Sequence, residues 1–149
     1  MKRLVTAQNR LLERLRAAEA FRVQAQTTGF EHLRGHKYAL LVSYRRSGEP
    51  VPTAVWFGLT DGRVYVRTET DAGKVKRIRR EPRVLIAPCD FRAKPRGPAA
   101  EGRARVLDEA EFARAEAALQ ANYGVGRRVF ESTGDRLGVE TLYLEVAPV

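Results

Sequence analysis

The sequence of 149 residues contains only one cysteine, Cys89. A single thiol cannot form a disulfide within the chain, and it cannot supply the several cysteines of a zinc or iron–sulfur site. Cys89 stands at the end of an apolar run, which is typical of a small buried residue. We therefore expect neither a disulfide framework nor a cysteine nucleophile.

Motifs that carry chemistry by themselves are also missing. There is no P-loop, no dinucleotide-binding glycine motif and no Ser/His/Asp signature. His32 and His36 are four residues apart, but Gly35 interrupts a helix between them and no third ligand is evident, so no metal site is predicted. The sequence assigns no catalytic residue. We expect a bound cofactor to carry the chemistry.

No stretch approaches the ~20 apolar residues that cross a bilayer. The first residues lead to polar positions such as Gln8 and Asn9 instead of an apolar run with a cleavage site. We therefore expect a cytoplasmic protein without membrane contact. A length of 149 residues favours one compact core.

Positive charge is abundant, because 27 Lys and Arg against 18 Asp and Glu give a net charge of +9. Such an excess favours an anionic partner. Two blocks, residues 1–37 and 63–83, each hold eight basic and three acidic residues. A nucleic-acid-binding module is one alternative, but it needs aromatic side chains among the basic ones, and residues 74–83 contain none. Nucleic acid is thus the less favoured partner.

Alternation and turn signals predict a mainly β chain of the α+β class. The predicted strands are 38–44, 51–59, 63–68, 83–89, 99–107 and 141–146, and the first three form an antiparallel meander. Predicted helices are an N-terminal one, 74–80, and one from a capping box at Asp108 and Glu111 to about 122–124. Since an open sheet of six strands leaves exposed edges, we expect a small antiparallel barrel flanked by helices. Residues 1–29 form a helical extension and 30–149 the cofactor-binding barrel.

The best candidate site is the segment 68–74 at the start of the short helix. Unpaired backbone N–H groups and the helix dipole favour a phosphate there, and Gly73 permits its close approach. Thr68 adds a hydroxyl, Lys74 a charge, and Arg77 lies within one turn. The alternative is a solvated basic helix without a ligand.

The second candidate is the run from Pro50 to Trp56. Its two prolines lack ladder donors, which confines this strand to an edge or a barrel rim. A flat ring system fits against such an edge. The alternative for Trp56 is a core or interface residue, the commoner position of a lone tryptophan.

Three segments carry a family resemblance: 53–57 (TAVWF), 64–68 (VYVRT) and 73–83 (GKVKRIRREPR), with 84–88 following. From about residue 38 to 146 the chain resembles the split β-barrel flavin and deazaflavin proteins related to pyridoxamine 5'-phosphate oxidase. It is most similar to the branch that uses coenzyme F420, a deazaflavin with a phosphate and an oligoglutamate tail. The resemblance implies a six-stranded antiparallel split β-barrel, of the FMN-binding type, with flanking helices.

The resemblance also implies roles for particular residues. Thr68 and Lys74 would hold the phosphate. The ring would lie at a homodimer interface against the second strand, which contributes Pro52, Thr53, Ala54, Val55 and Trp56. Flavin oxidases of this group place a serine where this chain has Ala72 and an arginine where it has Thr53. These departures disfavour FMN and pyridoxamine phosphate oxidation.

The leading hypothesis is a homodimeric F420-dependent oxidoreductase that transfers a hydride between reduced F420 and a small organic substrate. Tyr123 and Arg127 are candidates to line the substrate pocket from the partner subunit. The alternative within the same fold is a protein that binds FMN or haem. Neither the substrate nor the proton donor can be read from the sequence.

Overall fold

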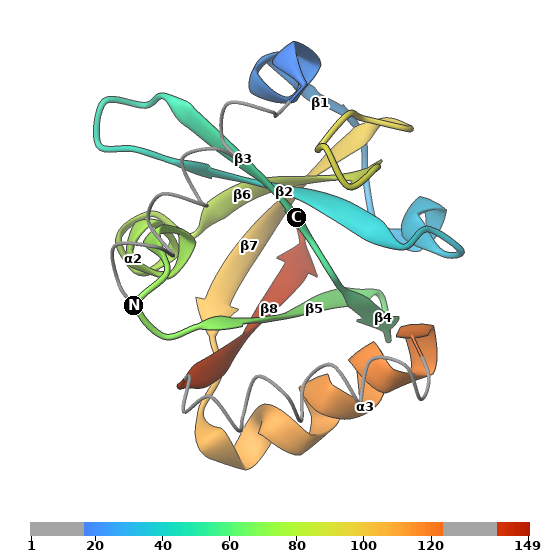
Figure 1. The fold of residues 1–149 in the computed structure, drawn as a ribbon, viewed down its shortest axis with the longest axis vertical. Coiled ribbons are helices and arrows are strands. Elements are labelled where there is room, and N and C mark those ends of the chain that lie inside the picture. The colour runs from blue at the N-terminus through green and yellow to red at the C-terminus, as the bar shows by residue number, and fades with distance from the viewer. Residues whose placement is uncertain (1–16, 124–139) are drawn as a thin grey trace.

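The computed structural model describes residues 17–123 and 140–149, and they form one curved sheet with helices around it (Figure 1). The strands are β1 (Ala25–Thr27), β2 (Tyr38–Tyr44), β3 (Pro50–Val55), β4 (Gly58–Thr60), β5 (Arg63–Glu69), β6 (Arg83–Cys89), β7 (Ala99–Val106) and β8 (Thr141–Pro148). The helices are α2 (Gly73–Arg80) and α3 (Phe112–Tyr123), and the 3-10 turns are η1 (Ala18–Arg22), η2 (Glu31–Leu33) and η3 (Glu109–Glu111).

Seven strands follow the order β3-β2-β6-β7-β8-β5-β4, all antiparallel, and β1 adds to β7 in parallel. β3 and β4 stand at opposite ends of this path, although only Trp56 and Phe57 separate them in the chain. The sheet must therefore curl round on itself and split between these two strands. The mainly β, α+β class and the split barrel are confirmed, but the prediction of six antiparallel strands is wrong, because the described residues form eight strands and β1 is parallel to β7.

The strand predicted over 51–59 is wrong at Trp56 and Phe57, where the chain leaves β3 and enters β4. At this break the Phe57 backbone pairs with side chains of α3, because its N–H donates to the Tyr123 hydroxyl and its carbonyl accepts from the Asn122 amide, each at 2.9 Å. Gly58 then packs closely on α3, where a Cβ built on it would lie 2.3 Å from the backbone carbon of Ala118. The structure contains both predicted hairpins, as β2–β3 and β4–β5. The second turns through Asp61 and Gly62, and these two residues have positive φ, as a tight primed turn requires.

Apolar side chains gather in three groups. The barrel interior is filled by one cluster, which includes Phe30, Leu41, Phe57, Ile86 and Leu144. A second cluster lies on the other face of β2 and β6, where η1 packs. A third cluster joins α3 to the outside of β5 and β8, so that α3 runs along the outer wall of the barrel (Figure 1).

The predicted N-terminal helix is wrong where the structure describes it, because residues 17–29 hold the 3-10 turn η1 and the strand β1. Residues 1–16 lie outside the described residues. The capping box at Asp108 and Glu111 is confirmed at the start of η3 and α3. No helix in the described part of the chain is long and apolar enough to cross a membrane.

Candidate functional site

The helix α2 begins, as predicted, at the candidate phosphate site after β5. Its N-cap residue, Ala72, makes no side-chain cap, and the first turn contains no acidic residue. Thr68 ends the buried part of β5 and is only 7% exposed. Its hydroxyl makes no hydrogen bond to any described residue, and it is not sealed from solvent. The first turn of α2 thus offers N–H donors, a hydroxyl and the cation of Lys74.

Arg77 adds a second cation to this helix start. Its Nε donates a hydrogen bond of 2.7 Å to the Ser43 hydroxyl on β2. Its guanidinium lies against Gly73, where a Cβ would come within 2.8 Å of Nη1. A positive charge at a helix N-terminus opposes the helix dipole, at roughly 0.3–1 kcal/mol. An anion bound between the two would turn this repulsion into attraction.

β3 lies beside β2, the strand whose Ser43 holds Arg77. It pairs only with β2, so its second edge has no strand partner among the described residues. Ser43, which holds Arg77, is the Cα partner of Val51. Thr53 follows Val51 by two residues along β3, and Val55 follows it by four. At ~3.3 Å per residue, Val55 is about 13 Å from Val51. One elongated ligand could therefore reach from α2 along β3.

Pro52, Thr53, Ala54 and Val55 alternate across β3 as predicted. Thr53 and Ala54 are half-buried, whereas Pro52 and Val55 are buried. Val55 belongs to the interior cluster and Ala54 packs against the cluster on the opposite face. Thr53 is thus on the interior-facing side of an edge strand, where a side chain can still meet a ligand.

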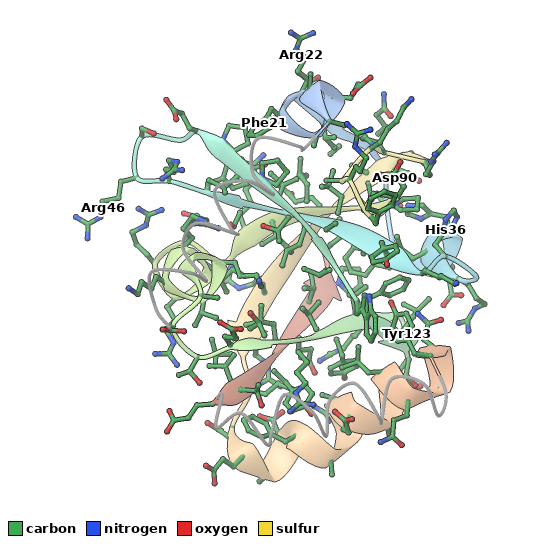
Figure 2. The ribbon with its side chains drawn as sticks, viewed as in Figure 1. Phe21, Arg22, His36, Arg46, Asp90 and Tyr123 are labelled. Atoms are coloured by element: carbon green, nitrogen blue, oxygen red, sulfur yellow. The ribbon has the colours of Figure 1, made fainter. Side chains whose placement is uncertain are left out.

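Trp56 lies at the end of β3 and stacks on Tyr123, the last residue of α3. The ring centroids are 4.9 Å apart and the planes differ by 21°. The Tyr123 hydroxyl accepts a hydrogen bond of 2.9 Å from the Phe57 backbone N–H and donates one to the Lys37 carbonyl. Tyr123 points from α3 toward the break between β3 and β4 (Figure 2). The chain's own Tyr123 therefore meets Trp56, and Arg127 lies outside the described residues.

Two further arginines of the basic segment are held by the protein. Arg80 donates to the Tyr44 carbonyl at the end of β2. Arg83 pairs with Glu101 at 2.6 Å and lies 4.9 Å from the centroid of the Tyr44 ring. A solvated basic helix does not describe these contacts, and they leave less free charge for nucleic acid than the sequence indicated.

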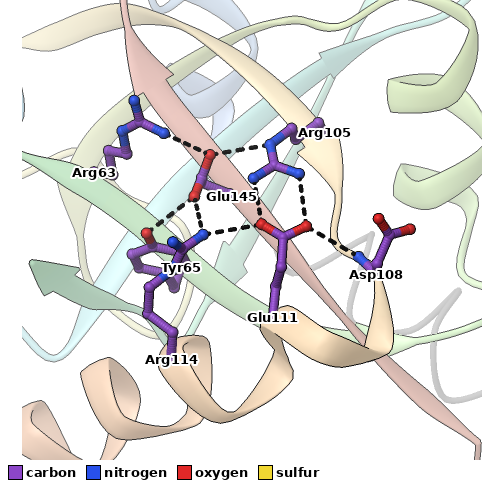
Figure 3. A network of polar contacts seen from close by, with 7 residues as sticks. All are labelled: Arg63, Tyr65, Arg105, Asp108, Glu111, Arg114 and Glu145. Carbon is purple, nitrogen blue, oxygen red and sulfur yellow. Dashed lines mark hydrogen bonds and ion pairs between the residues drawn. The ribbon is translucent and has the colours of Figure 1, made fainter.

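A polar network around Glu145 on β8 is the main feature that sequence reasoning missed (Figure 3). This carboxylate is 2% exposed and accepts hydrogen bonds from Arg63, Arg105, Arg114 and Tyr65. Burial raises its pKa, but the hydrogen bonds from Tyr65 and Arg105 and the nearby positive charges hold the pKa below its ordinary value. Because the network ties three strands to α3, we interpret it as structural.

Glu111 extends this network from the start of α3. It pairs with Arg105 at 2.6 Å and Arg114 at 3.0 Å, and the hydrogen bond from Arg105 is the main reason that its pKa falls to about 2.

No group of three or more His, Cys, Asp or Glu among the described residues could hold a metal ion. Burial, with a smaller effect of the Asp90 charge, raises the pKa of Cys89 to about 12.

Comparisons with known proteins agree with this architecture. The sequence model of the family called pyridoxamine 5'-phosphate oxidase matches residues 29–141. Comparison with curated protein sequences gives no significant match.

Among solved structures, the heme storage protein HutZ of Vibrio cholerae has a TM-score of 0.60 at 12% identity, covering 80% of this chain and 86% of its own. A conserved hypothetical protein of Mycobacterium tuberculosis has a TM-score of 0.58 at 16% identity, covering 85% and 89%. A FAD-binding protein of Mesorhizobium loti has a TM-score of 0.53 at 15% identity, covering 77% and 81%. At such identities the likeness establishes the fold alone.

Proposed function

The chain belongs to the pyridoxamine 5'-phosphate oxidase family, and from this we propose that it is an F420-dependent oxidoreductase, with the cofactor bound between the start of α2 and the edge of β3. The observation that carries the proposal is the acid-free first turn of α2, against which Ser43 holds the Arg77 guanidinium. The backbone N–H groups of a helix N-terminus and a neighbouring guanidinium both favour a bound phosphate. The family resemblance independently points to Thr68 and Lys74 at the same helix start.

The residues present fit a deazaflavin better than FMN. Ala72 has no hydroxyl, and the N-cap position it occupies therefore adds no side-chain donor to a phosphate. Thr53 gives β3 no cation where flavin oxidases have arginine. The remaining donors are Thr68, the backbone of α2, Lys74 and Arg77. They suffice for one phosphate, and the net charge of +9 favours the additional carboxylates of the F420 tail.

The described residues bind and orient, and they leave hydride chemistry to the cofactor. Reduced F420, when bound, supplies a hydride from C5 of its ring. The unpaired edge of β3 would lie against that ring, with the Trp56–Tyr123 stack closing the far end. This stack would form one wall for a small organic substrate.

A homodimer is part of the proposal. β3 has no second strand partner among the described residues, and a cofactor on its open edge needs a further wall to exclude water. We expect a second copy of the chain to supply that wall. Size-exclusion chromatography with light scattering should therefore give twice the chain mass of 16.7 kDa.

Haem binding is the alternative within the same fold, and one described contact weighs against it. His32 Nε2 lies 2.8 Å from the Pro98 carbonyl oxygen, which ties the imidazole to the backbone. The other histidine, His36, is four residues on. The absorbance spectrum of freshly purified protein separates the cases, because a red protein with a Soret band would reject the F420 proposal.

A fluorescence titration with F420 tests the site. Lys74→Ala should weaken F420 binding about tenfold, as expected for a charge-assisted contact to a phosphate. Lys76→Ala is the matched control, since it removes the same charge from the exposed face of the same helix. Equal affinity for the Lys74→Ala protein and the wild type would exclude this phosphate site.

A further inference from the structure

A cavity of about 370 Å³, open to solvent, lies between the last turn of α2 and β7, away from the residues that the proposed cofactor site uses. Its volume is near the lower end of the roughly 300–1,000 Å³ of small-molecule pockets. Three arginines line it, Arg79, Arg103 and Arg105, together with the apolar Ile78, Pro82 and Val106. No acidic side chain is among the lining residues. The cavity therefore has the composition of a site for an organic anion.

The fold creates this cavity where two strands stop pairing. The register of β6 with β7 begins at Arg83 and Arg103. Beyond it, the Ala104 N–H donates a hydrogen bond of 2.8 Å to the Pro82 carbonyl. Because Pro82 has no backbone N–H, it cannot donate a second ladder hydrogen bond to β7. β7 therefore continues to Val106 without β6 beside it. The last turn of α2 borders the space that remains.

The charges around the cavity are unequally neutralised. Arg105 is held by Glu111 and Glu145, at 2.6 and 3.1 Å. Within the described ranges, Arg79 and Arg103 have neither an ion pair nor a hydrogen bond from the side chain. Arg83, the Cα partner of Arg103, is already paired with Glu101. Two positive charges thus converge on the cavity without a counter-charge.

This cavity is separate from the start of α2. At 100° per residue, Lys74 and Arg79 project about 140° apart around the helix axis, and they flank the buried stripe of Val75 and Ile78 on opposite sides. Arg77 is on the side of Lys74 and contacts β2 through Ser43. Arg79 is on the side of β7. One phosphate cannot contact both ends.

We propose that the cavity binds a phosphate monoester of a small organic molecule, as a second ligand site of this protein. A phosphate monoester carries about −1.5 to −2 at pH 7, which matches the two arginines without counter-charge. Arginine forks bind its oxygens in a bidentate manner. The space beyond a phosphate group can hold an organic body against Ile78, Pro82 and Val106. The site does not depend on which cofactor the β3 edge binds.

Calorimetric titration of the full chain with phenyl phosphate at about 150 mM salt tests the proposal, because that salt screens non-specific attraction. We expect saturable binding that Arg103→Gln and Arg79→Gln each weaken about tenfold, as for loss of one charge-assisted contact. Arg46→Gln should leave it unchanged. Arg46 is an exposed residue at the tip of the β2–β3 turn and controls for net charge (Figure 2).

Three results would overturn the proposal. Binding that does not saturate would show no site. Equal weakening by Arg46→Gln and Arg103→Gln would show attraction to net charge alone. Loss of binding in Lys74→Ala with full binding in Arg103→Gln would place the probe at the start of α2. Inorganic phosphate should bind more weakly than phenyl phosphate, and equal binding would contradict a role for the apolar lining.

Discussion

The buried carboxylate of Glu145 gives the sharpest test of how the barrel holds its outer helix. Glu145→Gln keeps the shape of the side chain but removes its charge from among Arg63, Arg105 and Arg114. Glu145 is 2% exposed, whereas the three arginine side chains are 47–52% exposed. The substitution therefore leaves three cations near one another, each able to recover part of its hydration.

The expected cost follows from that difference in exposure. Breaking a fully buried ion pair costs about 3–5 kcal/mol, and because these arginines are half-exposed we expect about 2–3 kcal/mol. For a chain of this length each kcal/mol lowers Tm by about 2–4 °C, so Tm should fall by about 4–12 °C. Glu49→Gln is the matched control, since this exposed side chain makes no hydrogen bond or ion pair with any described residue.

The pH dependence gives the sign of the effect. The pKa of Glu145 lies below its ordinary value of 4.5 in the folded protein. The carboxylate therefore stabilises the fold fully above the unfolded pKa, and this stabilisation is lost as the pH falls through the folded pKa. The gap in unfolding free energy between wild type and Glu145→Gln should be constant from pH 6 to 8 and shrink below about pH 4.5.

Urea unfolding followed by circular dichroism measures this gap at each pH. The m-values of both proteins should agree, since the surface exposed on unfolding is the same. Equal stability of wild type and Glu145→Gln at pH 7, or a gap that grows on acidification, would refute the structural role given to this network.

Two further predictions concern the packing. Gly58→Ala should destabilise the protein by about 2–3 kcal/mol in the same unfolding assay, because the new methyl group would collide with the α3 backbone at Ala118 and neither segment can easily move; an unchanged midpoint would contradict this contact. Cys89, whose pKa burial raises to about 12, should react with a thiol reagent at pH 8 only after denaturation; rapid reaction of the native protein would show that it is accessible.

Much of the fold could be predicted because its signals are local. The turn at Asp61 and Gly62, the capping box at Asp108 and the β-rich runs of five of the six predicted strands each depend on a few neighbouring residues. The break of the strand over 51–59 depends instead on α3, which crosses Gly58 from sixty residues away in the sequence. No local sequence pattern indicates that α3 packs against Gly58.

Some features of the candidate site were also indicated by the local sequence, whereas others depend on the folded structure. The helix start at Gly73 and Lys74 was visible as a glycine and a lysine after a strand. The anchoring of Arg77 by Ser43 was not, since it needs the pairing of β2 with the other strands before the two residues meet. Glu145 likewise sits in an ordinary alternating strand, and only the packed structure gathers its three arginines from β5, β7 and α3.

We propose that the α2 start and the β3 edge select F420 over FMN. Fluorescence titration of the purified protein, freed of bound cofactor, with each compound under the same conditions compares the two affinities directly. We expect saturable binding of F420 at least tenfold tighter than that of FMN, since Ala72 and Thr53 lack the donors expected of FMN-binding relatives. Tighter binding of FMN than of F420 would contradict it.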